Sequence, residues 1–154
     1  MVNPLIADSL ALFVKTKNFH WHVSGAHFRD YQLLFDEQAE AILESVDILA
    51  ERVRRIGGTT IRSIGHISQL QTIGDDKEEF VPPEQMIQRL LADNRHMAEM
   101  QRAAISVCDQ KGDTATSNRP QEILDQTEKR VWFLHEVSQG ASQLVRAQPE
   151  RKAA

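Results

Sequence analysis

Acidic residues line one side of a stretch, residues 31–52, that otherwise has the apolar spacing of an α-helix. At about 100° per residue, these acids fall within an arc of about 80°, opposite an apolar stripe. Carboxylates are hard oxygen ligands for metal cations. The arc is therefore a candidate metal site, with a solvated helix face as the alternative. The acids are Asp36, Glu40, Glu44, Asp47 and Glu51.

The spacing of these residues excludes one shared ion within a single chain. Asp47 and Glu51 are four residues apart and can bind one ion together, and so are Gln32 and Asp36. Eleven residues separate Asp36 from Asp47, which is about 16 Å of helical rise. Two ligands of one ion lie only about 4 Å apart, so the two pairs cannot meet on one straight helix.

The two pairs can meet across two chains. The midpoint of positions 36 and 47 is also the midpoint of positions 32 and 51, next to Ala41. A second copy placed antiparallel about a two-fold axis there brings Asp36 level with Asp47 of the partner subunit and Gln32 level with Glu51 of the partner subunit. A two-fold axis makes each contact twice, so two sites form. Spacing alone leaves a chance coincidence as the alternative.

Composition indicates an ordinary soluble globular chain. Its 154 residues suit one domain, with 41% hydrophobic and 26% charged residues. The net charge of −4 does not indicate a nucleic-acid-binding protein. The single Cys108 excludes an internal disulfide, fits a reducing cytoplasm and is expected to be a small buried side chain. No basic N-terminal signal and no membrane-length apolar run stands out.

Helical periodicity covers most of the chain, and no segment has the apolar pattern of a β-strand. A short helix is expected within the connection 59–81. Four long helices with one long connection halfway indicate an all-α four-helix bundle with a crossover. We expect this domain to span residues 1–147 and to be followed by a flexible tail at 148–154. The long helices are expected at residues 4–22, 29–56, 83–111 and 118–146.

Local residues predict where several helices begin and end. Asn3 is expected as the N-cap of the first long helix. Gly57-Gly58 is expected to end the second. Residues 113–118, DTATSN, are expected as a turn, which places Pro120 in the first turn of the last helix, where proline is tolerated.

The histidines do not predict a di-iron centre contained in one bundle. Such centres carry Glu-x-x-His on two helices, and no Glu here has a His three residues later. His66, His96 and His135 lack ligand partners at useful spacing and are expected in core or surface roles. His22 and His27 are expected on the surface or in a loop.

The motifs NFHWHVSGAHF, FDEQAE and VDILAERVRRIGG resemble those of the Dps family, the DNA-binding proteins from starved cells. The segments RSIGHISQLQ, GDTAT and EKRVWFLHE extend the resemblance over nearly the whole chain. It implies a ferritin-like bundle that assembles into a hollow dodecamer. Such a shell oxidises Fe(II), preferably with hydrogen peroxide, stores ferric mineral without an organic cofactor and protects DNA from oxidative damage.

The resemblance also implies roles for individual residues at a ferroxidase site between two-fold-related subunits. His20 matches the histidine of the family's His-Trp pair, and Asp36 matches the acid of its second-helix motif. Asp47 and Glu51 match the acids in VDILAER and would come from the partner chain. Trp21 is implied as a nearby electron donor that limits radical escape, with a packed aromatic as the alternative.

Gln32 departs from the family pattern, which usually has a second histidine at this position. An amide oxygen is a weaker ligand for Fe(II) than imidazole. We therefore expect iron as the metal, with weaker or altered occupancy of one position in the pair. A fully silent site is the alternative.

Two further acidic groups are implied in iron handling. Glu40 and Glu44 would face the cavity and bind ferric ions as mineral nucleates; in a monomer they would only be solvated. Asp109, Asp113 and Glu122 would line three-fold pores that attract cations. Ordinary helix-end charges are the alternative for these three.

DNA binding is expected to be weak. In the family it commonly uses a tail rich in Lys and Arg, but residues 1–14 contain no basic residue. The C-terminus offers only Arg146, Arg151 and Lys152, and phosphate binding scales with such contacts. We expect a cytoplasmic protein, with nucleoid association as an option. The alternative function is a nucleoid-binding or structural shell with impaired ferroxidase activity.

Overall fold

The computed structural model describes the backbone of residues 2–112 and 114–146, and the side chains of residues 2–112 and 118–140. This part of the chain is helical, without strands. None of its helices is long and apolar enough to cross a membrane. The helices are α1 (Val2–His22), α2 (Phe28–Arg55), α3 (Ile64–Leu70), α4 (Pro83–Gln110) and α5 (Thr114–Arg146).

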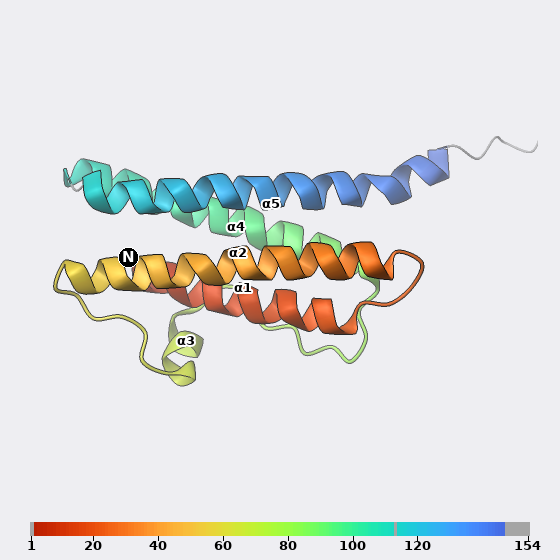
Figure 1. The fold of residues 1–154 in the computed structure, drawn as a ribbon, viewed down its shortest axis with the longest axis horizontal. Helices are drawn as coiled ribbons and strands as arrows, with labels where there is room; N and C mark the ends of the chain where they lie inside the picture. Colours follow the sequence, from red (N-terminus) through yellow and green to blue (C-terminus); the bar gives the residue numbers. More distant parts are fainter. Residues whose placement is uncertain (1, 113, 147–154) are drawn as a thin grey trace, which may run out of the picture.

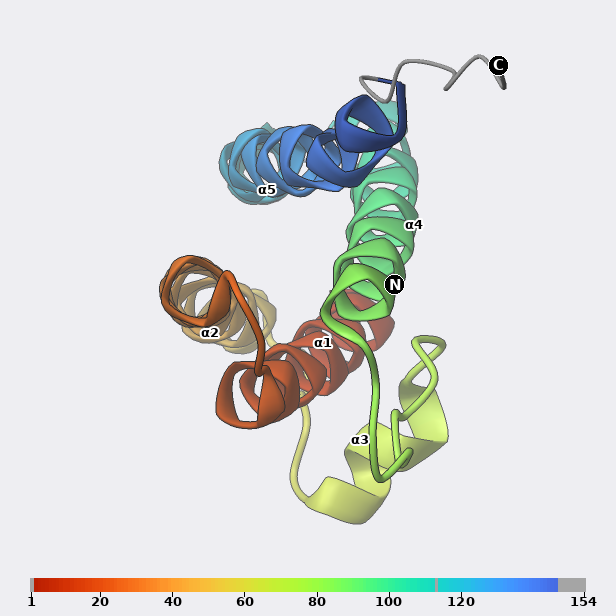
Figure 2. The same ribbon diagram turned by 90° about the vertical axis from the view of Figure 1, so that its right-hand side faces the viewer.

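The four long helices form a bundle in which α1 packs on α2 and α4 packs on α5 (Figures 1 and 2). A short turn joins the helices of each pair, whereas the long connection between α2 and α4 carries α3 along the outside of α1. This is the four-helix bundle with a crossover that the periodicity predicts, and the short crossover helix is also confirmed. The tail at 148–154 lies outside the described residues.

Two predicted helix starts are wrong. Asn3 lies inside α1 and caps nothing; its side-chain amide donates to the backbone carbonyl of Thr59 at 2.8 Å. Residues 114–118 are helical rather than a turn, so Pro120 lies inside α5 and not in its first turn. Gly112, with φ of 69°, makes the reversal after α4. Inside a helix, proline removes one backbone hydrogen bond and its ring crowds the carbonyl four residues earlier, yet α5 continues through Pro120.

Apolar residues at helical spacing form the core. Leu5, Leu12 and Phe19, spaced one heptad apart on α1, are all buried, and Phe35 and Ile42 of α2 are buried in the same cluster. Burying a side chain of this size stabilises the fold by about 1.5–3 kcal/mol. This shared core fixes the rotation of α2, which leaves its acidic arc outside the core.

A buried carboxylate holds the crossover against α1. Asp8 is 0% exposed. Its Oδ1 accepts hydrogen bonds from the backbone amides of Thr72 at 2.5 Å and Ile73 at 2.9 Å, and its Oδ2 accepts one from the Thr72 hydroxyl at 2.8 Å. Removing the acceptor from such a site leaves the donors buried and unpaired, which is costly.

Asp8→Ala is expected to lower the free energy of unfolding by about 3 kcal/mol, because two backbone amides lose their charged acceptor. Urea unfolding measures the loss, and hydrogen exchange should show reduced protection at the amides of Thr72 and Ile73. Asp75→Ala, at an exposed carboxylate of the same connection, is the control and should change stability by less than about 0.5 kcal/mol. Equal losses in the two variants would contradict the anchoring role of Asp8.

Candidate metal centre

The end of α1 and the start of α2 bring His20 next to Asp36. Gly25, with φ of 110°, lies in the turn between the two helices, so α2 runs back along α1. His20 Nδ1 donates to the backbone carbonyl of Gln32 at 2.8 Å. Since a carbonyl only accepts, Nδ1 carries the proton and Nε2 of the neutral ring carries the lone pair.

The free nitrogen of His20 faces a carboxylate. Nε2 lies 3.7 Å from Oδ1 of Asp36. Metal-binding histidines have this arrangement, in which one ring nitrogen is held by a backbone carbonyl and the other is free to ligate. The separation is within the range of about 4 Å expected for two ligands of one ion. We call this pair the histidine half-site.

Lys17 supplies the positive charge at the histidine half-site. Its Nζ donates to Oδ1 of Asp36 at 2.6 Å. This hydrogen bond lowers the pKa of the Asp36 carboxyl below its usual value. The carboxylate is therefore charged at neutral pH, and a metal ion at Oδ1 has to displace the ammonium group. Lys17 was not among the predicted site residues, although it lies three residues before His20 and so on the same helix face.

Gln32 contributes to this site through its backbone. Its carbonyl orients His20, a role that residue types alone do not reveal because every residue has a carbonyl. Its side chain begins one turn before that of Asp36 on the same side of α2. The amide as a metal ligand stays a prediction.

Asp47 and Glu51 form a second, separate group, which we call the acid half-site. Both are exposed on α2, and Glu51 accepts a hydrogen bond from Arg55 at 2.5 Å. Because α2 is unbroken from Phe28 to Arg55, about 16 Å of rise separates Asp36 from Asp47. Among the described side chains, no three His, Cys, Asp or Glu residues lie close enough to hold a metal ion. Each half-site is thus incomplete among the residues that the structure describes.

Trp21 is 64% exposed, so this chain alone does not bury it. Lys17 Nζ lies 5.8 Å from the centre of its ring, which places Trp21 beside the histidine half-site. Glu40 and Glu44 are both exposed on α2 between the two half-sites.

Two of the three acids implied at the pores lie in the part of the chain that the structure describes. Asp109 and Glu122 are exposed, and Glu122 accepts a hydrogen bond from Arg119 at 3.1 Å. Asp113 lies outside the described residues, and so do Arg151 and Lys152. Cys108 is buried, as predicted.

The remaining histidines lie where they were expected. His22, His27 and His135 are exposed, and His66 is partly buried on α3. His96 is also partly buried, and its Nε2 lies 2.8 Å from the Thr72 hydroxyl beside Asp8.

Comparison with known proteins agrees with this fold. Residues 1–143 match the ferritin-like domain family. The chain is 30% identical over 134 residues to a DNA protection during starvation protein of Brevibacillus brevis, covering 87% of this chain and 89% of that protein. It is also 30% identical over 141 residues to an uncharacterized low temperature-induced protein of Nostoc sp., covering 91% of this chain and 79% of that protein.

Two solved structures superpose closely on this chain. DpsC from Streptomyces coelicolor has a TM-score of 0.85 at 28% identity, covering 88% of this chain and 80% of that one. A Dps protein from Bacillus brevis has a TM-score of 0.84 at 29% identity, covering 88% of this chain and 91% of that one.

Lys17→Met is expected to raise the pKa of the Asp36 carboxyl toward its ordinary value, because the variant removes the hydrogen bond that favours the charged form. A carbon-detected NMR titration of the Asp36 carboxyl measures the change. Lys129→Met removes a lysine from α5 and should leave this titration as in the native chain. An unchanged pKa in Lys17→Met would show that the 2.6 Å contact does not control the carboxylate.

Proposed function

Because the chain belongs to the Dps proteins of the ferritin-like family, we propose that it binds Fe(II), oxidises it and stores the ferric product. In this proposal the chain assembles with copies of itself, ultimately into a dodecameric shell, and two chains complete each oxidation site. The observation that carries the proposal is the pair of incomplete half-sites on one continuous helix.

The positions of the half-sites suit a two-fold pairing of α2 with its copy. An antiparallel partner centred next to Ala41 places Asp47 and Glu51 of the partner subunit at His20 and Asp36. The same operation places the first chain's acid half-site at the partner's histidine half-site. Ala41, next to this axis along the sequence, is small and only partly exposed, and its side chain lies on the α5 side of α2.

The combined ligands suit iron as the substrate. One imidazole and three carboxylates form a mostly hard, anionic set. The negative charge stabilises Fe(III) more than Fe(II), which favours loss of an electron. Gln32 offers an amide oxygen where the family has a histidine, so the second iron position is the weaker one.

The reaction consumes two ferrous ions for each peroxide. Each Fe(II) loses one electron, the O–O bond of hydrogen peroxide breaks, and with two protons both oxygen atoms leave as water. Paired transfer avoids hydroxyl radical, and DNA is protected in this way. Lys17 holds Asp36 charged before iron arrives and moves off its oxygen when iron binds. Trp21, exposed beside the site, is placed to donate an electron to a stray one-electron oxidant.

Other acids serve the path of iron before and after oxidation. Asp109 and Glu122 attract incoming cations, and Glu40 and Glu44 bind ferric ions where mineral begins to form. We place this activity in the cytoplasm, in line with the single buried Cys108.

A shell with impaired ferroxidase activity is the second candidate function. Two observations favour it: the glutamine at position 32 and the ammonium group of Lys17 on Asp36. Such a shell would act by binding the nucleoid or as a structure. Retarded DNA in a gel at physiological salt, together with no iron uptake, would support it over the iron-oxidising function.

Complementation between two inactive variants tests the shared site. His20→Ala/Asp36→Ala and Asp47→Ala/Glu51→Ala should each abolish rapid Fe(II) oxidation by peroxide, measured by stopped-flow absorbance. When the two variants are co-assembled in equal amounts, half of the dimers contain one chain of each variant. Each of these mixed dimers has one intact site. The mixture should therefore recover about a quarter of the native rate. A site contained in one chain would recover no activity, and that result would overturn the proposal.

Gln32→His is expected to accelerate Fe(II) oxidation several-fold, because imidazole binds Fe(II) more strongly than an amide does. The initial rate at limiting iron is the readout. Gln126→His, a surface change on α5, should leave the rate unchanged. If Gln32→His leaves the rate unchanged as well, the amide does not limit iron oxidation, and the impaired-shell alternative loses its main support.

A further inference from the structure

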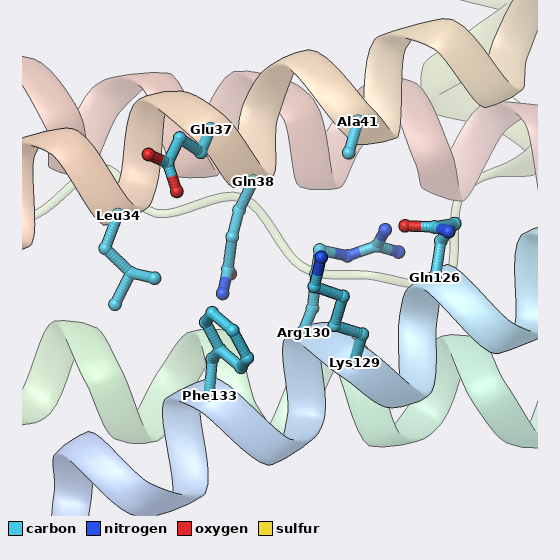
Figure 3. A pocket seen from close by; sticks show the side chains of 8 residues that line it. All are labelled: Leu34, Glu37, Gln38, Ala41, Gln126, Lys129, Arg130 and Phe133. Atoms are coloured by element: carbon cyan, nitrogen blue, oxygen red, sulfur yellow. The ribbon is translucent and has the colours of Figure 1, made fainter.

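A pocket lies between α2 and α5 and contains no residue of either half-site (Figure 3). Its cavity volume is about 100 Å³. Leu34 and Ala41 of α2 and Phe133 of α5 form its apolar walls. Its polar side chains include Arg130, whose buried charge is not paired with any carboxylate of the described residues.

Arg130 is 6% exposed. Its Nε donates to Oδ1 of Asn94 at 2.8 Å, and one terminal nitrogen donates to the hydroxyl of Thr127 at 2.8 Å. Both acceptors are neutral, and no carboxylate of the described residues forms an ion pair with this guanidinium. Burial lowers its pKa to about 10. A buried cation without a counter-ion is costly, and the remaining guanidinium donors are available to a molecule in the pocket.

Gln38 adds an unsatisfied polar group to the same pocket. It is 5% exposed, and neither its oxygen nor its nitrogen has a hydrogen-bond partner in the part of the chain that the structure describes. Its side chain extends from α2 toward Phe133 of α5 (Figure 3). Buried amides without partners are rare because each unmade hydrogen bond is costly. A ligand at this position would satisfy it.

Lys129 brings a second cation to the pocket. It lines the pocket beside Arg130, and its Nζ lies 5.7 Å from the centre of the Phe133 ring. Glu37, also on the wall, is the opposing charge. Two cations and one carboxylate leave one net positive charge, which favours a monoanion over a dianion.

We propose that this pocket binds a small organic monocarboxylate. Its carboxylate would lie between Arg130 and Lys129 and accept a hydrogen bond from the Gln38 amide. Its apolar body would lie on Leu34 and Phe133. Pockets for organic ligands share this combination of apolar walls and a few convergent polar groups. A phosphate ion fits less well, since it has no apolar surface for these walls and its second charge would meet Glu37.

Calorimetric titration of the full, iron-free assembly with three probes tests this site. Benzoate carries the charge and the apolar body, benzamide the body alone, and inorganic phosphate the charge alone. Benzoate is expected to saturate the site and to raise the thermal unfolding midpoint, because it binds the folded state. Benzamide and phosphate should each bind at least about tenfold more weakly. Equal or tighter binding of either would overturn the proposal.

Variants at the pocket separate ligand recognition from folding. Arg130→Gln should weaken benzoate binding at least about tenfold. Lys129→Gln, at an exposed position, tests the same charge without disturbing the interior and should weaken binding several-fold. Glu37→Gln should strengthen it, because repulsion is removed. Lys77→Gln, an exposed lysine of the crossover, is the control and should have no effect. If both Arg130→Gln and Lys129→Gln bind benzoate as tightly as the native protein does, the proposed carboxylate site is contradicted. A failure of benzoate to bind the native assembly would contradict it as well.

Discussion

An unbroken helix cannot bring residues eleven positions apart to the same metal ion. That constraint governs this protein, because α2 runs without interruption from Phe28 to Arg55 and carries both half-sites. The shared core fixes its rotation and its antiparallel path along α1, so His20 can reach Asp36 but not Asp47. A complete set of ligands therefore needs a second helix, and the symmetric spacing about Ala41 allows a copy of the same helix to supply it.

The histidine half-site balances charge in the absence of metal. Lys17 neutralises Asp36, and the Gln32 carbonyl keeps the His20 lone pair directed toward that carboxylate. The bundle can thus fold with the site preorganised and without an unpaired carboxylate at this position. The same lysine competes with an incoming cation, so stability before loading and affinity for metal oppose each other at one oxygen atom.

Buried polar groups in the bundle fall into two kinds. Asp8 has hydrogen-bond donors on both of its oxygens and holds the crossover. Arg130 and Gln38 lie in the interior between α2 and α5, yet no described carboxylate pairs with the guanidinium and no described group bonds to the amide. The first arrangement is complete within the chain and stabilises the fold. The second is incomplete, and a complementary anion would complete it.

Periodicity predicted the all-α bundle with its crossover helix, because the spacing of apolar residues along the sequence determines the apolar face of each helix. The buried heptad positions of α1 follow from the same spacing. Local signals were less reliable at helix ends: the capping role of Asn3 and the turn at residues 114–118 were wrong, since Asn3 bonds to Thr59 and helix α5 continues through Pro120.

The sequence by itself determined which ligands share a face of α2 and that one chain cannot gather them, because helical rise per residue is nearly constant. Only the tertiary structure showed that His20 lies beside Asp36 and that the Gln32 carbonyl orients the His20 ring. It also showed that Lys17 bonds to the Asp36 carboxylate. It also revealed that the buried Arg130 and Gln38 line one pocket. These contacts join residues on different helices or involve backbone atoms, and their geometry depends on how the helices pack rather than on spacing along the chain.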